Sequence, residues 1–379
     1  MEQQTESRRL VKVVVVDDIV PHSNADALEL AIIGGWQCCV KKGEFKKGDL
    51  GVYFEIDSML PLDTPEFAFL QGRNEREFEG KRYARIKTMK LRKELSQGLL
   101  LPLNFIDWTE LEGTAGFCLV RFAESEIGSG LMTPEQFCDQ VSTLTQILGV
   151  VKYEPALPAC LSGNAKGLFP SFLRKSDQER IQNLKREHEK AIGEEFEVTF
   201  KLDGSSFTAF VFRDGAEDQN IYTGLCSRNL ELKVDESNAE NTFVQTFNNY
   251  DLDSRLREYF NETGNFIAIQ GEMVGPGIQN NFEGLQDVQL FVYNVFDIRE
   301  QKYLLPDDAR KVVEELGLNY VPVFKAVHQL TETIPQLLEM AEGPSGLNGK
   351  YREGLVFKSL TRNFSFKAIS NSYLAKNDG

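Results

Sequence analysis

Short strands broken by tight turns dominate the first part of the chain and restrict its fold more than any other feature. The strand-forming stretches are residues 10–20 (LVKVVVVDDIV), 27–40 (ALELAIIGGWQCCV) and 50–60 (LGVYFEIDSML). Gly, Asp and Lys residues separate these stretches, and no helical period lies between them. Short strands at this spacing are typical of a small closed β-barrel. We therefore expect residues 1–125 to form one barrel domain.

The remainder of the chain mixes strands with helices. A chain of 379 residues exceeds the size at which one hydrophobic core stops growing, so a second domain is expected. Residues 126–165 are rich in Gly, Pro and Ser and are predicted to be a junction, and residues 166–379 an antiparallel α+β domain. Its predicted strands are 194–204, 205–215, 266–275, 288–298, 351–360 and 365–370. Helices are predicted over 133–148, 176–192 (with Ser176 and Glu179 as a capping box), 236–260, 305–317 and 334–343.

The overall charge is acidic, −15 at pH 7, which argues against a nucleic-acid partner unless basic residues are concentrated locally. Residues 81–93 (KRYARIKTMKLRK) provide such a concentration, with seven Lys or Arg residues. They form either a solvated strand edge or a phosphate-binding stripe on the barrel. No apolar run approaches the roughly 18 residues of a membrane span, and the first residues lack a secretion signal. A cytoplasmic protein is expected.

Lys201 stands just before an Asp-Gly pair in the stretch FKLDGSSF, residues 200–207. Asp-Gly between alternating apolar residues predicts a tight hairpin turn, next to which Lys201 would be a solvated charge. Other charged residues in apolar strands favour a different interpretation: Glu272 ends one strand, Glu353 precedes another, and Lys367 lies within a third. Buried charges are costly unless they are paired, so these groups are expected to converge on one site.

A lysine among carboxylates points to covalent phosphoryl or nucleotidyl chemistry. A free amine has a pKa of about 10.4 and is protonated, so it cannot attack. A divalent metal held by the carboxylates would lower that pKa and also neutralise the phosphate under attack. This chemistry fits the residues better than glycoside hydrolysis or proton abstraction does.

Six segments of the second domain resemble, in order, the nucleotidyltransferase motifs of polynucleotide ligases and RNA capping enzymes. They are KLDGSS, SRNLELK, GEMVGPGIQNN, FVYNVFDI, REGLVFKS and FSFKAIS. The GPGIQ and FDI elements are similar to the RNA ligase branch. Upstream, residues 21–61 and 85–103 resemble the amino-terminal OB domain of the Deinococcus and Naegleria type of ATP-dependent RNA ligase, the fifth RNA ligase family. The resemblance runs from about Leu10 to Leu374.

This resemblance implies an OB-type β-barrel followed by an antiparallel-sheet, ATP-grasp-like adenylyltransferase domain. Ligases that carry the OB domain after the last motif differ, since only 12 residues follow Lys367 here (379 minus 367). It also implies catalytic roles for Lys201, as the adenylated nucleophile, and for Lys367 at the α-phosphate. Mg²⁺ or Mn²⁺ would be held, largely through water, by Asp203, Glu272 and Glu353.

The resemblance assigns further residues to ATP and nucleic acid. ATP contacts are expected from Arg180 at the leaving phosphates, Arg228 at the ribose, and Phe296 and Val356 on the two faces of adenine. Without the motifs, Phe296 and Val356 would be core residues, Arg228 a turn residue and Arg180 a helix-surface residue. Nucleic-acid contacts are expected from Arg85, Lys87, Lys90, Arg92, Lys93 and Asn229. Two departures are Phe200, where related ligases often carry an acid, and Ile369, where some carry a second lysine.

The expected reaction is the joining of a 3'-OH to a 5'-phosphate through lysyl-AMP and an adenylylated 5'-phosphate. The expected partner is RNA, or an RNA/DNA duplex, with a nick that has ribonucleotides on its 3'-OH side, bound by a monomer. Two alternatives stay open: a DNA ligase or capping-type nucleotidyltransferase, and a non-catalytic OB-fold nucleic-acid-binding protein whose transferase site has decayed.

Overall fold

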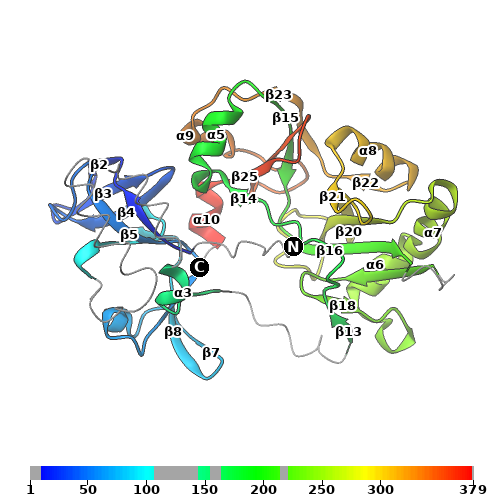
Figure 1. Cartoon of the computed structure of the whole chain (residues 1–379), viewed down its shortest axis with the longest axis horizontal. Helices are drawn as coiled ribbons and strands as arrows, with labels where there is room; N and C mark the ends of the chain where they lie inside the picture. The colour runs from blue at the N-terminus through cyan, green and yellow to red at the C-terminus, as the bar shows by residue number, and fades with distance from the viewer. Residues whose placement is uncertain (1–9, 106–143, 154–163, 214–220, 378–379) are drawn as a thin grey trace. The chain divides into compact units, whose positions relative to one another are not determined.

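The computed structural model describes residues 10–105, 144–153, 164–213 and 221–377 (Figure 1). The chain divides into two compact units, Met1–Ala156 with Leu374–Gly379, and Leu157–Tyr373. In the described parts of the chain, every helix is too short or too polar to cross a membrane.

The first unit is built from short antiparallel strands, as its sequence predicts. One sheet has the order β1-β5-β11, another β2-β3-β4, a third β12-β6-β8-β7, and β9 pairs with β10. The strand bounds are β1 Val11–Val15, β2 Asp18–Pro21, β3 Leu28–Ile33, β4 Trp36–Lys41, β5 Leu50–Phe54, β6 Ser58–Pro61, β7 Glu75–Phe78, β8 Lys81–Arg85, β9 Met89–Leu91, β10 Glu94–Ser96, β11 Leu99–Pro102 and β12 Val151–Lys152. The other elements described in this unit are two 3₁₀ turns, Pro65–Leu70 and Leu103–Phe105, and helix α3, Leu144–Ile147.

The sequence predicts a closed barrel, but the described strands do not form one. Among the described residues the strand pairs leave four separate sheets, and no continuous hydrogen-bonded ring joins them. Two apolar clusters fill the space between the sheets, one around Phe54 and Phe67 and one around Trp36 and Tyr53. Alternation along β5 explains the division, because Phe54 and Tyr53 point to opposite faces.

The second unit is organised around two sheets. The larger has the order β13-β18-β17-β16-β19-β20-β21, with β22 also paired to β20, and the smaller has the order β14-β25-β24-β15-β23. The strand bounds are β13 Ala165–Leu168, β14 Glu179–Arg180, β15 Glu195–Lys201, β16 Ser205–Phe212, β17 Tyr222–Cys226, β18 Leu230–Leu232, β19 Ile267–Val274, β20 Gln289–Asp297, β21 Lys302–Tyr303, β22 Asn319–Tyr320, β23 Val323–Gln329, β24 Gly354–Ser359 and β25 Ser365–Ile369.

Helices cover one face of each sheet (Figure 1). Helices α6 (Thr242–Asn249), α7 (Leu252–Thr263) and α8 (Pro306–Glu315) pack on the larger sheet through a cluster that includes Phe207, Phe247 and Leu256. Helices α5 (Lys185–Ala191) and α9 (Ile334–Met340) cover the smaller sheet through Phe196, Leu337 and Phe357. Two 3₁₀ turns, η3 (Ile181–Asn183) and η4 (Glu236–Asn238), and helix α10 (Asn371–Asn377) are the remaining helical elements described.

Local sequence signals explain several helix ends. The Asn241 side chain accepts from Phe243 N at the start of α6, and Gly264 ends α7 in the left-handed conformation with φ 69°. Pro306 and two aspartates open α8, and Thr333 with Gln336 forms a capping box at α9.

Two local predictions were wrong. Strands β15 and β16 do not pair with each other, so Asp203-Gly204 is a crossing between the two sheets and not a hairpin turn. The predicted helix over 176–192 is helical only from Lys185, because Glu179 and Arg180 form strand β14 beside β25. Ser176 caps nothing and instead bonds to the Tyr293 hydroxyl. The predicted helix over 133–148 lies mostly outside the described residues, and its described part is α3.

Candidate active site

Lys201 ends strand β15 and lies against Glu353. In the antiparallel register Lys201 is opposite Gly354, the first residue of β24, so Glu353 lies immediately beside it. The Lys201 Nζ is 2.7 Å from Glu353 Oε1, and the two side chains are 26% and 12% exposed. The amine predicted to be the nucleophile is therefore neither fully solvated nor sealed in the core.

The crossing from β15 to β16 brings a carboxylate of the larger sheet to the same place. Leu202 is buried with Val274, Phe291 and Val321 and anchors the crossing. Glu272, on β19, is directly opposite Ser206 of β16, and its charge interacts with those of Lys201, Glu353 and Asp203. Gly204 must be a glycine here, since a Cβ would lie 2.6 Å from Val274 Cγ1 and would clash with the Met273 carbonyl.

The charges of this cluster are out of balance. Burial lowers the pKa of the Lys201 amine, but the carboxylates of Glu353 and Glu272 outweigh it, so that the pKa is raised overall. Burial raises the pKa of Glu272 to about 8, and burial together with the Glu353 charge raises the pKa of Asp203. Without an added cation, Lys201 is protonated and cannot attack. Nucleophilic attack requires a lowered lysine pKa, whereas the carboxylates alone raise it.

Sequence reasoning missed a fourth acid, Glu283. Its side chain is 1% exposed, it accepts from the backbone of Asp203 and from the Ser345 hydroxyl, and burial raises its pKa. Its only sequence signal is an acid beside an aromatic residue in NNFEG, two residues past the GEMVGPGIQNN segment. Glu283 fixes the backbone at Asp203 and adds a further carboxylate to the cluster.

The carboxylates fit a hydrated cation better than a bare one. Among the residues that the structure describes, no group of three or more acids, histidines or cysteines converges closely enough to hold a metal directly. Two buried carboxylate oxygens, Glu353 Oε2 and Glu283 Oε1, nevertheless have no donor among the described residues. Excess carboxylate charge with unmatched oxygens suits a divalent ion that keeps part of its water shell.

Lys367, Arg180 and Val356 form one row across the smaller sheet. Val356 of β24 is opposite Lys367 of β25, and Lys367 is opposite Arg180 of β14. Thr199 of β15 continues the row next to Val356, and Lys201 lies two residues further on. Because side chains alternate along strands, all of these residues face the same side of the sheet. The opposite side is the apolar face covered by α5 and α9.

The same alternation explains Phe200. It points away from Lys201, packs edge-on against Phe324, and has the Arg352 guanidinium 5.2 Å from its ring centre. Phe200 is therefore part of the apolar face, and its side chain does not contribute to the lysine side of the sheet.

Two residues near the site were not predicted. Tyr293 of β20 is half-buried, its hydroxyl bonds to Ser176 at 2.9 Å, and burial raises its pKa to about 12. Lys358, opposite Glu197 in the smaller sheet, donates to the Tyr293 carbonyl in the larger one. Burial lowers the pKa of Lys358 to about 8, against the opposing effect of Glu197. Lys358 thus links the two sheets.

Phe296 does not lie where adenine stacking would require. Its side chain is fully buried, and its ring packs edge-on against Tyr303 at 5.1 Å. No ring face is exposed, because this part of β20 lies under an aromatic cluster that includes Phe172 and Phe210. Tyr293 is the aromatic residue of β20 whose electrostatic interactions reach Glu272 and Lys201.

Arg228 and Asn229 lie in the loop between β17 and β18. The Arg228 side chain is 53% exposed, contacts Asp177 at 3.2 Å, and interacts electrostatically with Glu272. Asn229 Oδ1 accepts from Lys175 at 2.7 Å. Both are accessible to a ligand, and both have a side-chain partner.

The basic residues 81–93 belong to the first unit and differ among themselves. Lys90, Arg92 and Lys93 are exposed on the β9–β10 hairpin, and Lys87 is half-buried. Arg85 is the exception, because it pairs with Asp57 at 2.7 Å and lies 3.9 Å from the Tyr153 ring centre. Because Arg85 is already paired with Asp57 and packed on Tyr153, its position does not support the predicted nucleic-acid contact.

Comparison with known families agrees with this arrangement. Residues 194–369, which span both sheets from β15 to β25, match the family model described as RNA ligase. Residues 10–103 match an OB-fold domain model. The two matched regions together place the chain among ligases that join an OB-fold domain to an RNA ligase domain.

Solved structures make the assignment more specific. Naegleria gruberi RNA ligase with pyrophosphate is 36% identical, with a TM-score of 0.78 over 98% of this chain and 99% of that one. A substituted form of that ligase with ATP and Mn matches at 36% identity and a TM-score of 0.77 over 96% and 98% of the two chains. A second substituted form, with AMP and Mn, is 36% identical, with a TM-score of 0.78 over 97% of this chain and 98% of that one. The chain belongs to the RNA ligase family. A search of curated proteins found no match.

Proposed function

We propose that this RNA ligase uses ATP and a divalent cation to join a 3'-OH RNA end to a 5'-phosphate, with a nicked duplex as its substrate. The observation that carries the proposal is the position of Lys201 at the crossing between the sheets, 2.7 Å from Glu353 and within electrostatic reach of Glu272 and Asp203. The Naegleria gruberi ligase, which has been solved with ATP and Mn and with AMP and Mn, supports the choice of ATP.

The reaction has three steps, and in each step one bond to phosphorus forms while another breaks. The Lys201 amine attacks the α-phosphorus of ATP, a P–N bond forms, and pyrophosphate leaves. An oxygen of the RNA 5'-phosphate then attacks the same phosphorus, which releases the lysine and leaves AMP on the RNA end. Finally the 3'-OH attacks the 5'-phosphorus, the phosphodiester forms, and AMP leaves.

The carboxylates and cations of the site have separate tasks. Asp203, Glu272 and Glu353 would hold the divalent cation, largely through water, and Glu283 fixes the Asp203 backbone. A cation bound there would lower the pKa of the Lys201 amine and neutralise phosphate charge. Lys367 and Arg180, opposite each other in the sheet, stabilise the α-phosphate and the leaving phosphates respectively.

Adenine and ribose are held by neighbouring residues. Val356, in the same row as Lys367, packs against the base, and Arg228 reaches the ribose. Tyr293 replaces Phe296 as the aromatic residue proposed for the base, because Phe296 has no exposed surface. In the OB-fold domain, Lys87, Lys90, Arg92 and Lys93 contact the phosphate backbone, and Asn229 does so from the catalytic unit.

The decisive experiment labels the protein with ATP that carries the label on its α-phosphate, in the presence of Mg²⁺ or Mn²⁺. Covalent label is expected on the wild-type chain, and Lys201→Ala should abolish it. A wild-type chain that takes up no label with either metal would exclude the enzymatic proposal and favour a binding protein with a decayed site.

Substrate and nucleotide choice are tested separately. Nicks with a 3'-terminal ribose should be sealed, and those with a 3'-terminal deoxyribose should not. Label taken up from GTP in preference to ATP would indicate capping-type chemistry. We also propose that the protein is a monomer and that it acts in the cytoplasm. Size measurement in solution tests the first property, and cell fractionation tests the second.

A further inference from the structure

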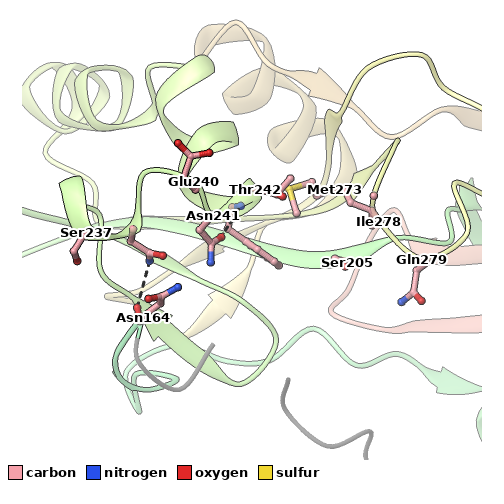
Figure 2. Close-up of a pocket in the computed structure, with 12 residues that line it drawn as sticks. Asn164, Ser205, Ser237, Glu240, Asn241, Thr242, Met273, Ile278 and Gln279 are labelled. Carbon is pink, nitrogen blue, oxygen red and sulfur yellow. Dashed lines mark hydrogen bonds between the residues drawn. The ribbon is translucent and has the colours of Figure 1, made fainter. Parts of the chain in front are cut away.

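A cavity of about 540 Å³ lies in the second unit, beside the start of helix α6 (Figure 2). Three segments line it: the η4–α6 region from Ser237 to Phe243, the strand ends at Ser205 and Met273, and the loop from Gly277 to Gln279. Asn164 closes one side. We call this cavity the back pocket. Its volume is within the range of about 300–1,000 Å³ that small-molecule sites occupy.

The back pocket is on the other face of the larger sheet from the carboxylate cluster. Ser205 is opposite Met273 in the β16–β19 register, while the next pair is Ser206 and Glu272. Successive side chains of a strand point to opposite faces, so Ser205 and Met273 face away from Glu272. The contact of Met273 Sδ with Thr246 Oγ1 of α6, at 3.1 Å, confirms the direction. The back pocket is therefore separate from the site proposed for adenylation.

The lining of the back pocket is polar but almost uncharged. It offers amide groups from Asn164, Asn238, Asn241 and Gln279 together with hydroxyl groups. Among the lining residues that the structure describes there is no Lys, Arg or His, and the one charged side chain is the carboxylate of Glu240. A phosphate inside the pocket would meet the Glu240 carboxylate and no cation among the described lining residues, so the interior does not fit a phosphate group. Neutral amides suit the hydrogen-bonding edge of a nucleobase.

Apolar side chains complete this match. Phe243 is half-buried, and its ring lies parallel to the buried ring of Phe207, with an interplanar angle of 1°. Met273 and Ile278 supply further apolar surface. An aromatic ring with polar amides around it is the arrangement that proteins use to stack and read unpaired RNA bases.

Asn238 contributes a buried amide to the wall of the back pocket. Its side chain is 2% exposed, and its Nδ2 donates to the carbonyls of Lys233 at 2.8 Å and Asn164 at 3.4 Å. Those two acceptors fix the orientation of the amide, which leaves Oδ1 as an acceptor without a donor among the described residues. A buried acceptor without a donor is unfavourable. Asn238 is thus a buried part of the wall, and the accessible amides of the lining, those of Asn164, Asn241 and Gln279, are the ones that can meet a base edge.

We propose that the back pocket binds a nucleoside, with its base against Phe243 and its polar edge toward the accessible amides, and that this nucleoside is an unpaired residue of the RNA substrate. The identity of the RNA rests on the proposed ligase function. Gln279 lines the back pocket and also donates to the Gly204 carbonyl at 3.3 Å. The wall of the pocket is thus continuous with the crossing that carries Asp203, and a bound base would hold RNA next to that crossing.

The first test uses a short single-stranded oligoribonucleotide that carries one thio-substituted, photoreactive base. Irradiation of the full-length protein should attach the RNA to the peptide that contains Phe243 or to the one that contains Met273. Attachment only to peptides outside the back pocket would overturn the proposal.

The second test measures RNA affinity in variants. Phe243→Leu keeps an apolar side chain but removes the ring, and Ser237→Trp fills the back pocket from its exposed rim. Each should raise the Kd for the oligoribonucleotide about fivefold or more, the loss expected for one base–aromatic stack. Gln245→Ala, an exposed change on the same helix that does not line the back pocket, is the matched control and should leave the Kd unchanged.

Adenylation separates failure of this inference from failure of the proposed function. Label from ATP should be retained in all three variants, since the back pocket is on the opposite face of the sheet from Lys201. Retained label with an unchanged Kd in Phe243→Leu and Ser237→Trp would overturn the inference and leave the ligase function intact. Free adenosine or uridine is the remaining probe. Binding of the free nucleoside without any effect on RNA affinity would overturn the assignment to RNA.

Discussion

Lys201 Nζ lies 2.7 Å from Glu353 Oε1, while the second oxygen of the same carboxylate, Oε2, is buried without a donor among the described residues. One carboxylate thus holds the lysine in its protonated form and still has capacity for a second positive group. In the proposed mechanism, Glu353 would link cation binding to lysine activation, because a cation bound to this carboxylate would weaken its interaction with the amine.

Glu353→Gln removes the carboxylate that raises the lysine pKa most, yet it should impair adenylation. The pKa of Lys201 should fall, since its closest negative partner is removed. Cation affinity should fall as well, and we expect the apparent metal requirement to rise about 10–100-fold. The measurement is the rate of label transfer from ATP against metal concentration. Glu339→Gln, an exposed acid on α9, is the control, and equal effects of the two changes would contradict a role for Glu353.

Gly204→Ala should destabilise the crossing between the sheets. A Cβ at this position meets Val274 Cγ1 at 2.6 Å and the Met273 carbonyl, so either the crossing or β19 must move. We expect a loss of roughly 1–3 kcal/mol in the free energy of unfolding and slower adenylation. Gly167→Ala is a matched control, since nothing lies within 4 Å of its added Cβ. Denaturant unfolding checks the prediction, and an unchanged midpoint for Gly204→Ala would refute it.

Lys358→Met should stabilise the protein near neutral pH. Burial lowers the pKa of Lys358 to about 8, so the folded state holds a costly charge below pH 8. Between about pH 8 and the ordinary lysine pKa of about 10.4, the folded protein has released this proton and the unfolded chain has not, so wild-type stability rises with pH. The gain in Lys358→Met, roughly 1–3 kcal/mol at pH 7, should thus shrink by pH 10.

Unfolding free energies at pH 7 and pH 10 test this expectation. Lys302→Met, at a half-exposed position, should change the unfolding free energy by less than about 0.5 kcal/mol at either pH. A gain in Lys358→Met that is equal at both pH values would point to apolar packing as its cause, and not to the buried charge.

The basic hairpin should account for part of the salt dependence of RNA binding. Replacement of Lys90 and Lys93 by Gln should weaken RNA binding at low salt. The slope of log affinity against log salt should fall by roughly 0.7–0.9 for each RNA phosphate that these lysines no longer neutralise. Arg85→Gln should leave that slope unchanged and lower the stability of the domain, because Arg85 is paired with Asp57 and packed on Tyr153. The opposite pattern would reverse these assignments.

The sequence was most informative about strands and about the order of the motifs, because both depend on local patterns. Alternation predicted the strands that carry Lys201, Glu272 and Lys367, and with hindsight it also places Phe200 on the far side of its sheet. The pairing of strands is non-local, which is why Asp203-Gly204 was predicted to be a hairpin turn. A run of basic residues likewise does not show which of them pair with distant acids, as Arg85 does with Asp57.

Burial and backbone support were also out of reach. Phe296 fits a motif that implies adenine stacking, but whether a ring face is exposed depends on Phe172, Phe210 and Tyr303, which come from separate segments. Glu283 acts through the backbone of Asp203, 80 residues earlier (283 minus 203), and carries no local pattern that identifies it. Both depend on the packing of segments that are far apart in the sequence.

The row formed by Arg180, Lys367 and Val356 has a consequence for how the enzyme matures. Strand β14 is two residues long, its one partner among the described strands is β25, and the two opposed residues are 187 positions apart (367 minus 180). While the polypeptide is still being synthesised, Arg180 emerges from the ribosome long before its partner strand. We therefore expect nascent chains that end before Ser365 to bind RNA through the OB-fold domain while being unable to accept AMP from ATP.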